Sequence, residues 1–315
     1  MFANIITWLA LAATAVLLAW LATRAWRSPR WYVKWPGMIL SGLLSLVFVA
    51  VCAVALQGLY KLYWPQGSDI QLTVEGTPEQ IQRGQYLASA FCAGCHSQTG
   101  ELPLAGGVDL AKDVPMPIGS MISANLTPAG PLQNWTDGEI YRALRESVDN
   151  KGRALPTMST VYARFMSDED IKAIIAYLRS QPAVDHPIQD PPSQLNFLGV
   201  LVTGMGMVPE LPEVTGEIIA PPKEATAEYG AYIISYQDCR LCHGANLTGG
   251  TNTLTPNGPT LRMVKGWTQE QFIDAMRTGV NPDGRQLIEL MPWKIIGRMD
   301  DTDLAALYQY IASVE

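Results

Sequence analysis

The residues with the clearest chemistry form two copies of the pattern Cys-x-x-Cys-His, namely Cys92, Cys95 and His96, and Cys239, Cys242 and His243. This pattern attaches a c-type haem, because its two thiols add across the porphyrin vinyl groups and the adjacent histidine becomes an axial ligand to iron. The two copies use four of only five cysteines and two of only three histidines. We therefore predict two covalently bound haem c groups.

Two other kinds of site also use paired cysteines. A zinc site would pair two Cys-x-x-Cys knuckles roughly 15 to 20 residues apart, whereas these pairs are separated by more than a hundred residues. A thioredoxin-like redox pair needs a βαβ context, which neither flank provides. Zinc binding and disulfide chemistry are therefore the alternatives to haem attachment.

The second axial ligand of each iron must come from the last histidine or from methionine. Because His186 is the third histidine, at most one iron could be bis-histidine, and we expect His186 to be an exposed linker side chain. Met/His coordination is the usual electron-transfer arrangement, so we predict Met158 and Met291, which occupy equivalent irregular segments. Met166 and Met299 are the alternatives, since each precedes a helix N-cap where an apolar residue usually packs on the first turn.

An internal repeat surrounds the two motifs. The segment from Asn134 to Tyr177 and the segment from Gly266 to Tyr310 share Trp-Thr, an Ala-x-Arg triplet, Gly-Arg, two methionines and a tyrosine in the same order. Helical periodicity follows Ser167 and Asp300, and each of these residues resembles an N-cap with an acid three residues on. The sequence predicts a mainly α fold of short helices and loops around each haem.

The first 66 residues are typical of a membrane anchor. No charge occurs from Met1 to Thr23 or from Trp35 to Tyr60, and each stretch approaches or exceeds the roughly 20 residues that a helix needs to cross a bilayer. The connection Arg24–Pro36 holds four basic residues and no acid, which places it in the cytoplasm. We predict two transmembrane helices, with Cys52 packing against lipid or a neighbouring helix. A cleaved signal peptide is the alternative, although a basic n-region is missing.

The remainder of the chain is acidic. Because residues 1–66 hold five basic residues and no acid, the rest carries 17 basic and 29 acidic residues, a net charge of −12. Such a charge disfavours nucleic acid as a partner and would steer a basic docking face.

Eight prolines lie between Pro182 and Pro222 and predict a linker that does not continue a helix. Within it, Leu195–Val208 is an uncharged apolar run too short to span a bilayer, so we expect it to be buried in the protein or to lie on the membrane or a partner. The sequence thus predicts four parts: a transmembrane hairpin (1–66), a first haem domain (77–181), the linker (182–222) and a second haem domain (223–315).

These residues resemble class I cytochrome c domains, and in particular the cytochrome c subunits of membrane-bound alcohol and gluconate dehydrogenases. The resemblance covers about residues 77–315 and includes Arg83-Gly-Gln-Tyr-Leu, Asn125-Leu-Thr-Pro128, Asn134-Trp-Thr-Asp137 and Phe165-Met-Ser-Asp-Glu-Asp170. It implies that the loop Gly258-Pro-Thr-Leu261 orients His243 through the carbonyl of Pro259. In the first domain it implies Pro117 for the same role.

The chain also departs from that family. Those subunits usually carry three haems and a C-terminal anchor or none, whereas this chain has two motifs behind an N-terminal hairpin. Met158 is followed by Ser159, so the family's ligand assignment carries over less directly there than at Met291-Pro292. Two helices followed by two haems also resembles the dihaem subunit of cbb3-type oxidases and the cytochrome subunits of alternative complex III.

The resemblance implies a dihaem cytochrome c anchored in the bacterial inner membrane, with its haem domains on the periplasmic side. It would pass electrons from a quinol-oxidising complex or dehydrogenase to a soluble cytochrome c, a cupredoxin or a terminal oxidase, together with integral membrane subunits. Such a subunit is not an enzyme by itself. The alternatives are a dihaem peroxidase, which needs one displaceable axial ligand, and an assembly subunit with one haem off the electron path.

Overall fold

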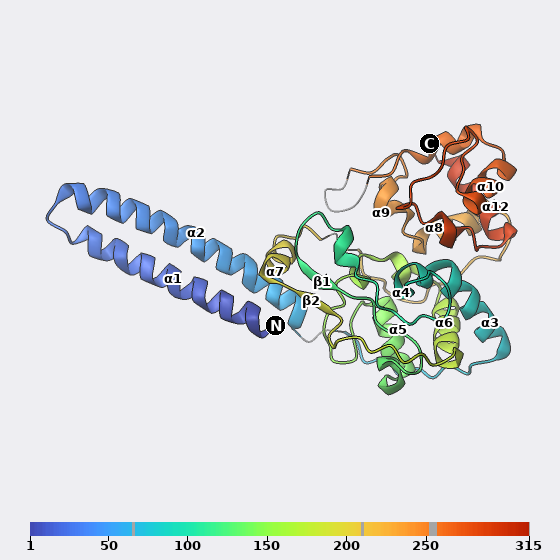
Figure 1. Cartoon of the computed structure of the whole chain (residues 1–315), viewed down its shortest axis with the longest axis horizontal. Helices are drawn as coiled ribbons and strands as arrows, with labels where there is room; N and C mark the ends of the chain where they lie inside the picture. The colour runs from blue at the N-terminus through green and yellow to red at the C-terminus, as the bar shows by residue number, and fades with distance from the viewer. Residues whose placement is uncertain (65–66, 209–210, 252–256, 315) are drawn as a thin grey trace. The chain divides into compact units, whose positions relative to one another are not determined.

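The computed structural model describes residues 1–64, 67–208, 211–251 and 257–314 (Figure 1). The chain divides into two compact units. The hairpin unit comprises Met1–Pro65, Met116–Gly119 and Gln194–Pro209, and the repeat unit comprises Gln66–Pro115, Ser120–Ser193 and Glu210–Glu315. Most of the regular structure is helical, which confirms the predicted mainly α class.

The hairpin unit is built on two long antiparallel helices, α1 (Phe2–Trp26) and α2 (Trp31–Tyr63) (Figure 1). Both are long and apolar enough to cross a membrane. The predicted connection Arg24–Pro36 is shorter in the structure, because α2 begins at Trp31 and accommodates Pro36 inside the helix. Cys52 is buried against α1, where the Trp8 indole Nε1 donates a 2.9 Å hydrogen bond to its carbonyl.

The predicted linker contains one helix, α7 (Phe197–Gly204), which packs on α2. The two backbones touch, since a Cβ added at Gly58 would lie 2.0 Å from the Val200 carbonyl oxygen, and one at Gly204 would lie 2.0 Å from that of Val54. Small residues allow this close approach between helices. The apolar run is thus buried in the protein on one side, and its exposed large side chains are Leu198, Met205 and Met207.

Extended structure is confined to one two-stranded sheet in the part of the chain that the structure describes. Its strands are β1 (Gly119–Met121) and β2 (Ser193–Leu195) (Figure 1).

The repeat unit contains two similar helix sets. Repeat 1, residues 77–181, has α3 (Pro78–Leu87), α4 (Ala93–His96), α5 (Asp137–Arg145) and α6 (Asp168–Ser180). Repeat 2, residues 223–315, has α8 (Ala227–Tyr236), α9 (Cys239–His243), α10 (Gln269–Thr278), α11 (Trp293–Ile296) and α12 (Asp301–Ser313). Short 3-10 turns join them at Leu110–Asp113, Pro131–Asn134, Met158–Thr160, Tyr162–Phe165 and Leu261–Gly266, and a π-helical turn lies at Ala88–Cys92.

Side-chain caps start these helices at defined residues. The predicted caps are confirmed, because the Ser167 hydroxyl accepts from the Asp170 amide and the Asp300 carboxylate accepts from the Asp303 amide. Each such cap contributes about 1 kcal/mol. Reciprocal capping boxes start three more helices, and their pairs are Thr77 with Gln80, Thr136 with Glu139, and Thr268 with Gln271.

The same helix crossing forms the core of each repeat. In repeat 1, α3 meets α6 at Gly84, where an added Cβ would lie 1.9 Å from the Ala173 carbonyl oxygen. In repeat 2, α8 meets α12 at Gly230, where it would lie 2.0 Å from that of Ala306. Glycine at both crossings lets the first and last helices touch backbone to backbone, and it fixes the segments that follow α3 and α8.

Candidate functional site

The first Cys-x-x-Cys-His segment follows a change in helical winding. The chain leaves α3 through the π-helical turn Ala88–Cys92, and α4 carries Cys95 and His96. Single π-helical turns are frequent at functional sites. Cys92 is buried, whereas Cys95 and His96 keep partial exposure. This turn therefore directs one thiol inward and leaves the other two groups near the surface.

The second segment forms one short helix, α9, directly after α8. His243 is buried, and Cys239 and Cys242 are partly exposed. The residue before α9 is Asp238, whose pKa rises to about 6 because of desolvation. Both predicted motifs therefore lie at the same place in the two repeats, immediately after the first helix.

The four motif thiols are free of disulfide bonds. Desolvation raises the pKa of Cys92 to about 12, that of Cys95 to about 11 and that of Cys239 to about 12. Zinc binding needs thiolates, and the described residues hold no cluster of three or more His, Cys, Asp or Glu side chains able to bind a metal ion. These neutral thiols fit haem attachment better than zinc coordination.

A backbone carbonyl orients His243. Its ring Nδ1 lies 2.7 Å from the Pro259 carbonyl oxygen, which confirms the role predicted for Pro259. A donating Nδ1–H fixes the tautomer and leaves Nε2 free for a metal. Gly258 is needed beside it, because an added Cβ would lie 2.7 Å from the same Nδ1. The ring is thus held as an axial ligand of iron must be held.

His96 is oriented in the same way by a different residue. Its Nδ1 lies 3.0 Å from the Ala124 carbonyl oxygen, and desolvation lowers its pKa, which favours the neutral imidazole that a metal needs. The prediction of Pro117 for this role is wrong. The Pro117 carbonyl instead accepts a 2.6 Å hydrogen bond from the Asn196 amide, and both residues belong to the hairpin unit.

The loop that presents the Ala124 carbonyl is built by Asn125. The Asn125 side-chain oxygen accepts from the Thr127 amide at 2.9 Å and from its hydroxyl at 2.7 Å. The Asn125 side-chain amide donates to the Val184 carbonyl at 2.9 Å and to that of His186 at 3.1 Å. The Asn-Leu-Thr-Pro phrase was the sequence signal for this loop, but its connection to the linker became visible only in the structure.

His186 is not an exposed linker side chain, as the sequence led us to expect. It is half-buried, and its Nδ1 lies 2.9 Å from the Ala105 carbonyl oxygen. A Cβ at Gly107 would lie 2.5 Å from its ring. The adjacent Gly106 amide donates to the His96 carbonyl at 2.8 Å. His186 therefore anchors the linker against the loop that follows the first motif.

The four methionines considered as ligands differ in burial. Met166 and Met299 are fully buried in the core directly before their N-caps, which is the packing role expected for them. Met158 begins a 3-10 turn, Met291 lies in the turn before α11, and both are partly exposed. A core side chain would have to leave its packing to reach iron. This contrast favours Met158 and Met291, whose role as ligands stays a prediction.

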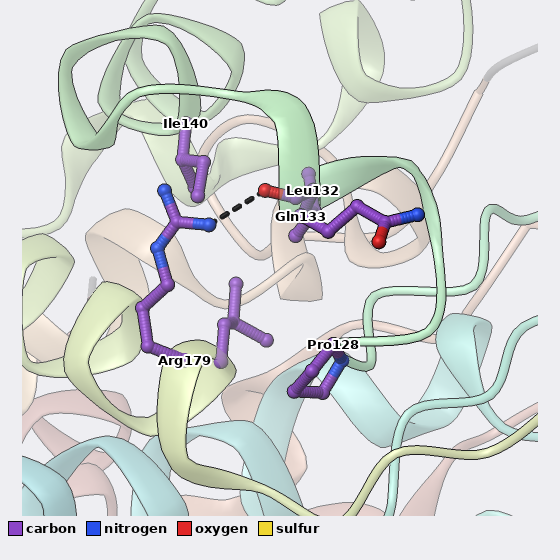
Figure 2. A pocket seen from close by; sticks show the side chains of 6 residues that line it. Pro128, Leu132, Gln133, Ile140 and Arg179 are labelled. Carbon is purple, nitrogen blue, oxygen red and sulfur yellow. Dashed lines mark hydrogen bonds between the residues drawn. The ribbon is translucent and has the colours of Figure 1, made fainter.

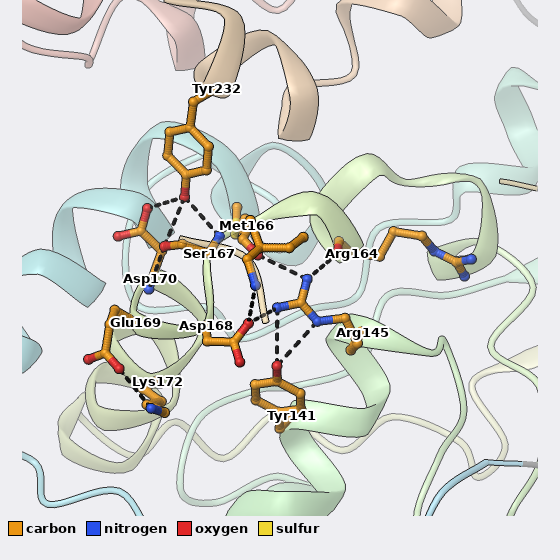
Figure 3. Close-up of polar contacts among 11 residues, drawn as sticks. Tyr141, Arg145, Arg164, Met166, Ser167, Asp168, Glu169, Asp170, Lys172 and Tyr232 are labelled. Carbon is orange, nitrogen blue, oxygen red and sulfur yellow. Dashed lines mark hydrogen bonds and ion pairs between the residues drawn. The ribbon is translucent and has the colours of Figure 1, made fainter. Parts of the chain in front are cut away.

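A buried arginine that the sequence did not single out supports the end of repeat 1 (Figure 3). The Arg145 guanidinium donates to the Met166 carbonyl at 2.9 Å and to Asp168 at 2.7 Å, and it also bonds the Arg164 carbonyl. Its counterpart Arg277 bonds the Gly297 carbonyl and Asp301. The repeated Ala-x-Arg triplet was the available signal. Each arginine ties the segment before the buried methionine to the start of the last helix.

A hollow of about 190 Å³ in repeat 1 lies outside the two motif segments (Figure 2). The Arg179 guanidinium borders it and donates to the Leu132 carbonyl at 2.6 Å. None of the described residues that line it is a cysteine, histidine or methionine, so it offers no ligand to iron. Its lining residues are Pro128, Leu132, Gln133, Ile140, Leu178 and Arg179.

Known proteins resemble this chain over most of its length. The relatives include the gluconate 2-dehydrogenase cytochrome c subunit of Pantoea cypripedii, 27% identical over 73% of this chain and 51% of that protein. The cytochrome c subunit of the quinone-type alcohol dehydrogenase of Gluconacetobacter polyoxogenes is 28% identical over 44% of this chain and 31% of that protein. The fructose dehydrogenase cytochrome subunit of Gluconobacter japonicus is 33% identical over 26% of this chain and 20% of that protein. This chain therefore spans about half or less of the length of these relatives.

The sequence model of the cytochrome c family matches the chain twice, at residues 81–182 and 227–315. Each match contains one Cys-x-x-Cys-His segment whose histidine is held by a backbone carbonyl. Together the two matches cover more than half of the 315 residues. The chain belongs to the cytochrome c family.

Proposed function

We propose that this protein is a membrane-anchored dihaem cytochrome c that carries electrons as a subunit of a dehydrogenase complex. The observation that carries the proposal is the duplicated site, in which a Cys-x-x-Cys-His segment and a carbonyl-bound histidine occur once in each repeat. The names of the relatives support the dehydrogenase context, because each is a cytochrome subunit of such an enzyme.

The residues that would hold each group follow from the two motifs. Cys92 and Cys95 in the first haem domain (77–181), and Cys239 and Cys242 in the second (223–315), would form the thioether bonds. His96 with Met158, and His243 with Met291, would complete the coordination of the two irons. Haem c supplies an iron that takes up and gives up one electron. The carbonyl on each Nδ1 keeps the imidazole neutral and pointed at its ligand position.

A coordination shell of histidine and methionine suits electron transfer better than catalysis. Peroxidase activity would need one axial position that opens to a small molecule. The predicted methionines lie on surface turns at equivalent places, so both sites have the same donor set. The subunit therefore passes electrons and leaves substrate oxidation to a partner.

The two apolar helices place the haem domains beside the membrane. Arg24, Arg27, Arg30 and Lys34 lie at the turn between α1 and α2, and the positive-inside rule assigns that turn to the cytoplasm. Both ends of the hairpin then lie on the periplasmic side of a bacterial inner membrane. There the acidic haem domains can meet a basic soluble cytochrome c, a cupredoxin or an oxidase.

Haem count tests the proposal directly. The full chain is produced in a bacterium that attaches haem c, solubilised in detergent and weighed by intact mass spectrometry. We expect a mass increase of two haems and a c-type α band on reduction. The variant C92A/C95A should lose one haem and C239A/C242A the other, whereas the control C52A should keep both. A wild-type protein with one haem or none would contradict the proposal.

Partners and catalysis need separate measurements. The complex purified from native membranes should contain a dehydrogenase subunit, identified by mass spectrometry. Rapid cyanide binding to a high-spin ferric form at rest would instead point to a peroxidase.

A further inference from the structure

A tyrosine from repeat 1 reaches the last helix of repeat 2. The Tyr86 hydroxyl, on α3, donates to the Asp303 carboxylate at 2.5 Å. The same oxygen accepts a 3.0 Å hydrogen bond from the Asp300 amide. The N-terminus of α12 is thus bonded to the first helix of the other repeat.

Repeat 2 returns the same contact (Figure 3). The Tyr232 hydroxyl, on α8, donates to the Asp170 carboxylate at 2.6 Å and accepts from the Ser167 amide at 2.9 Å. Tyr86 and Tyr232 lie two residues after the crossing glycines Gly84 and Gly230. The two contacts are therefore related by the internal repeat. We call this pair of contacts the tyrosine latch.

Both acids of the latch are buried and have the same kinds of partner. Asp170 pairs with Arg83 of its own repeat at 2.8 Å, and Asp303 pairs with Lys223 of its own repeat at 3.1 Å. Their side chains are only 8% and 1% exposed. A buried carboxylate needs such partners, because an unpaired charge is costly in the interior. Each acid therefore takes one cation from its own repeat and one tyrosine from the other.

The latch brings the two haem-attachment segments together. Phe91, directly before Cys92, packs edge-to-face against Tyr236, with ring centroids 6.1 Å apart. The Arg298 guanidinium of repeat 2 donates to the Ser89 carbonyl at 3.2 Å. In the other direction, the Tyr162 amide of repeat 1 donates to Asp238, directly before Cys239, at 2.9 Å.

We propose that Tyr86 and Tyr232 are positioning residues that lock the two haem domains face to face, so that an electron passes directly between the two sites. This inference rests on the proposed dihaem function. In the step itself one ferrous iron is oxidised and one ferric iron is reduced by a single electron, and no bond forms or breaks. The latch acts by holding the segments on either side of the Phe91–Tyr236 contact at a fixed separation.

Hydrogen exchange on the full haem-loaded chain tests the lock. The probe is the Tyr162 amide, which crosses the interface to Asp238 but bonds neither latch tyrosine. In the double variant Y86F/Y232F two hydrogen bonds to carboxylates are lost, so exchange at this amide should rise about tenfold or more. The matched control is Y308F, which removes a 2.7 Å hydroxyl bond to the Trp267 carbonyl within repeat 2. It should leave the Tyr162 amide as slow as in the wild type.

A second readout follows electrons between the two sites. After photoreduction of one haem, redistribution to the other should be slower in Y86F/Y232F than in the wild type or Y308F, while both haems and their spectra are retained. A Tyr162 amide as protected in the double variant as in the wild type would overturn the lock. Faster exchange with unchanged redistribution would overturn the positioning role. Failure of the proposed function would appear separately, as a wild-type chain lacking two haems.

Discussion

At the residue scale, the two candidate iron ligands depend on carbonyl groups that do not belong to the Cys-x-x-Cys-His motifs. His243 uses Pro259 and His96 uses Ala124. A carbonyl has no side chain to identify it, so the type of residue that supplies it can differ between the repeats. What matters is that the loop brings an oxygen within hydrogen-bonding distance of Nδ1. A glycine or a buried amide beside that loop performs this task.

Gly258→Ala tests the space beside His243. The new Cβ would overlap the ring, so the ring or the loop must move, at a cost of about 1–3 kcal/mol in unfolding free energy. We expect weakened axial ligation at the second site, seen as a changed ferric absorption spectrum with the first site unchanged. Gly266→Ala is the control, because an added Cβ there meets nothing within 4 Å. Equal behaviour of the two variants would contradict this account.

Arg145 and Arg277 provide a second comparison, between a buried arginine and its exposed counterpart. Arg145→Gln breaks a buried ion pair and leaves carbonyls without a donor, which should lower the unfolding free energy by about 3 kcal/mol. Arg277 pairs with Asp301, whose side chain is 83% exposed, so Arg277→Gln should cost about 1 kcal/mol or less. Denaturant unfolding of the haem-loaded protein measures both. Similar losses would show that burial does not set the difference.

At the element scale, the first and last helices of each repeat determine where the motif begins. Their crossing glycines bring the backbones into contact, and the chain then turns directly into the Cys-x-x-Cys-His segment. In repeat 1 this transition uses a π-helical turn, whereas α8 ends before α9 begins. The same crossing thus tolerates two local solutions, because the helix pair and not the turn carries most of the packing.

The packing of α7 on α2 gives a test at this scale. Gly58→Ala would place a Cβ 2.0 Å from the Val200 carbonyl oxygen, which must separate the helices at a cost of about 1–3 kcal/mol. Hydrogen exchange of the α7 amides in detergent should become faster. Gly42→Ala in the same helix is the control, since its Cβ would meet nothing within 4 Å. Unchanged α7 exchange in Gly58→Ala would contradict the backbone contact.

At the scale of the whole molecule, charge and hydropathy divide the chain into two environments. The hairpin helices are apolar with basic residues at their turn, and the remainder is acidic. The two kinds of composition suit a bilayer and an aqueous compartment. A covalent tether of this kind keeps an electron carrier at the membrane surface.

Reporter fusions test the predicted sidedness. A reporter that is active only in the periplasm should be active when fused after residue 315 and inactive when inserted between Arg27 and Arg30. The positive-inside rule gives the reason, because the turn holds four basic residues. Replacing these four by glutamine should weaken the preference. Activity at the turn and none at the C-terminus would reverse the proposed topology.

The sequence by itself determined the features that depend on local pattern. The two motifs, the apolar helices and the N-caps at Ser167 and Asp300 each follow from residue types at short spacing. Such features involve neighbours along the chain, so their geometry is fixed by covalent connection and helical period. The family assignment belongs here as well, since it rests on the same phrases.

The tertiary structure alone decided which distant groups meet. Nothing local indicates that Ala124 instead of Pro117 faces His96, that His186 anchors the linker, or that Tyr86 reaches Asp303. These contacts join residues far apart in the chain, and they exist because two helix crossings and one repeat interface bring them together. Buried hydrogen bonds between such residues depend on the complete packing, which no single segment encodes.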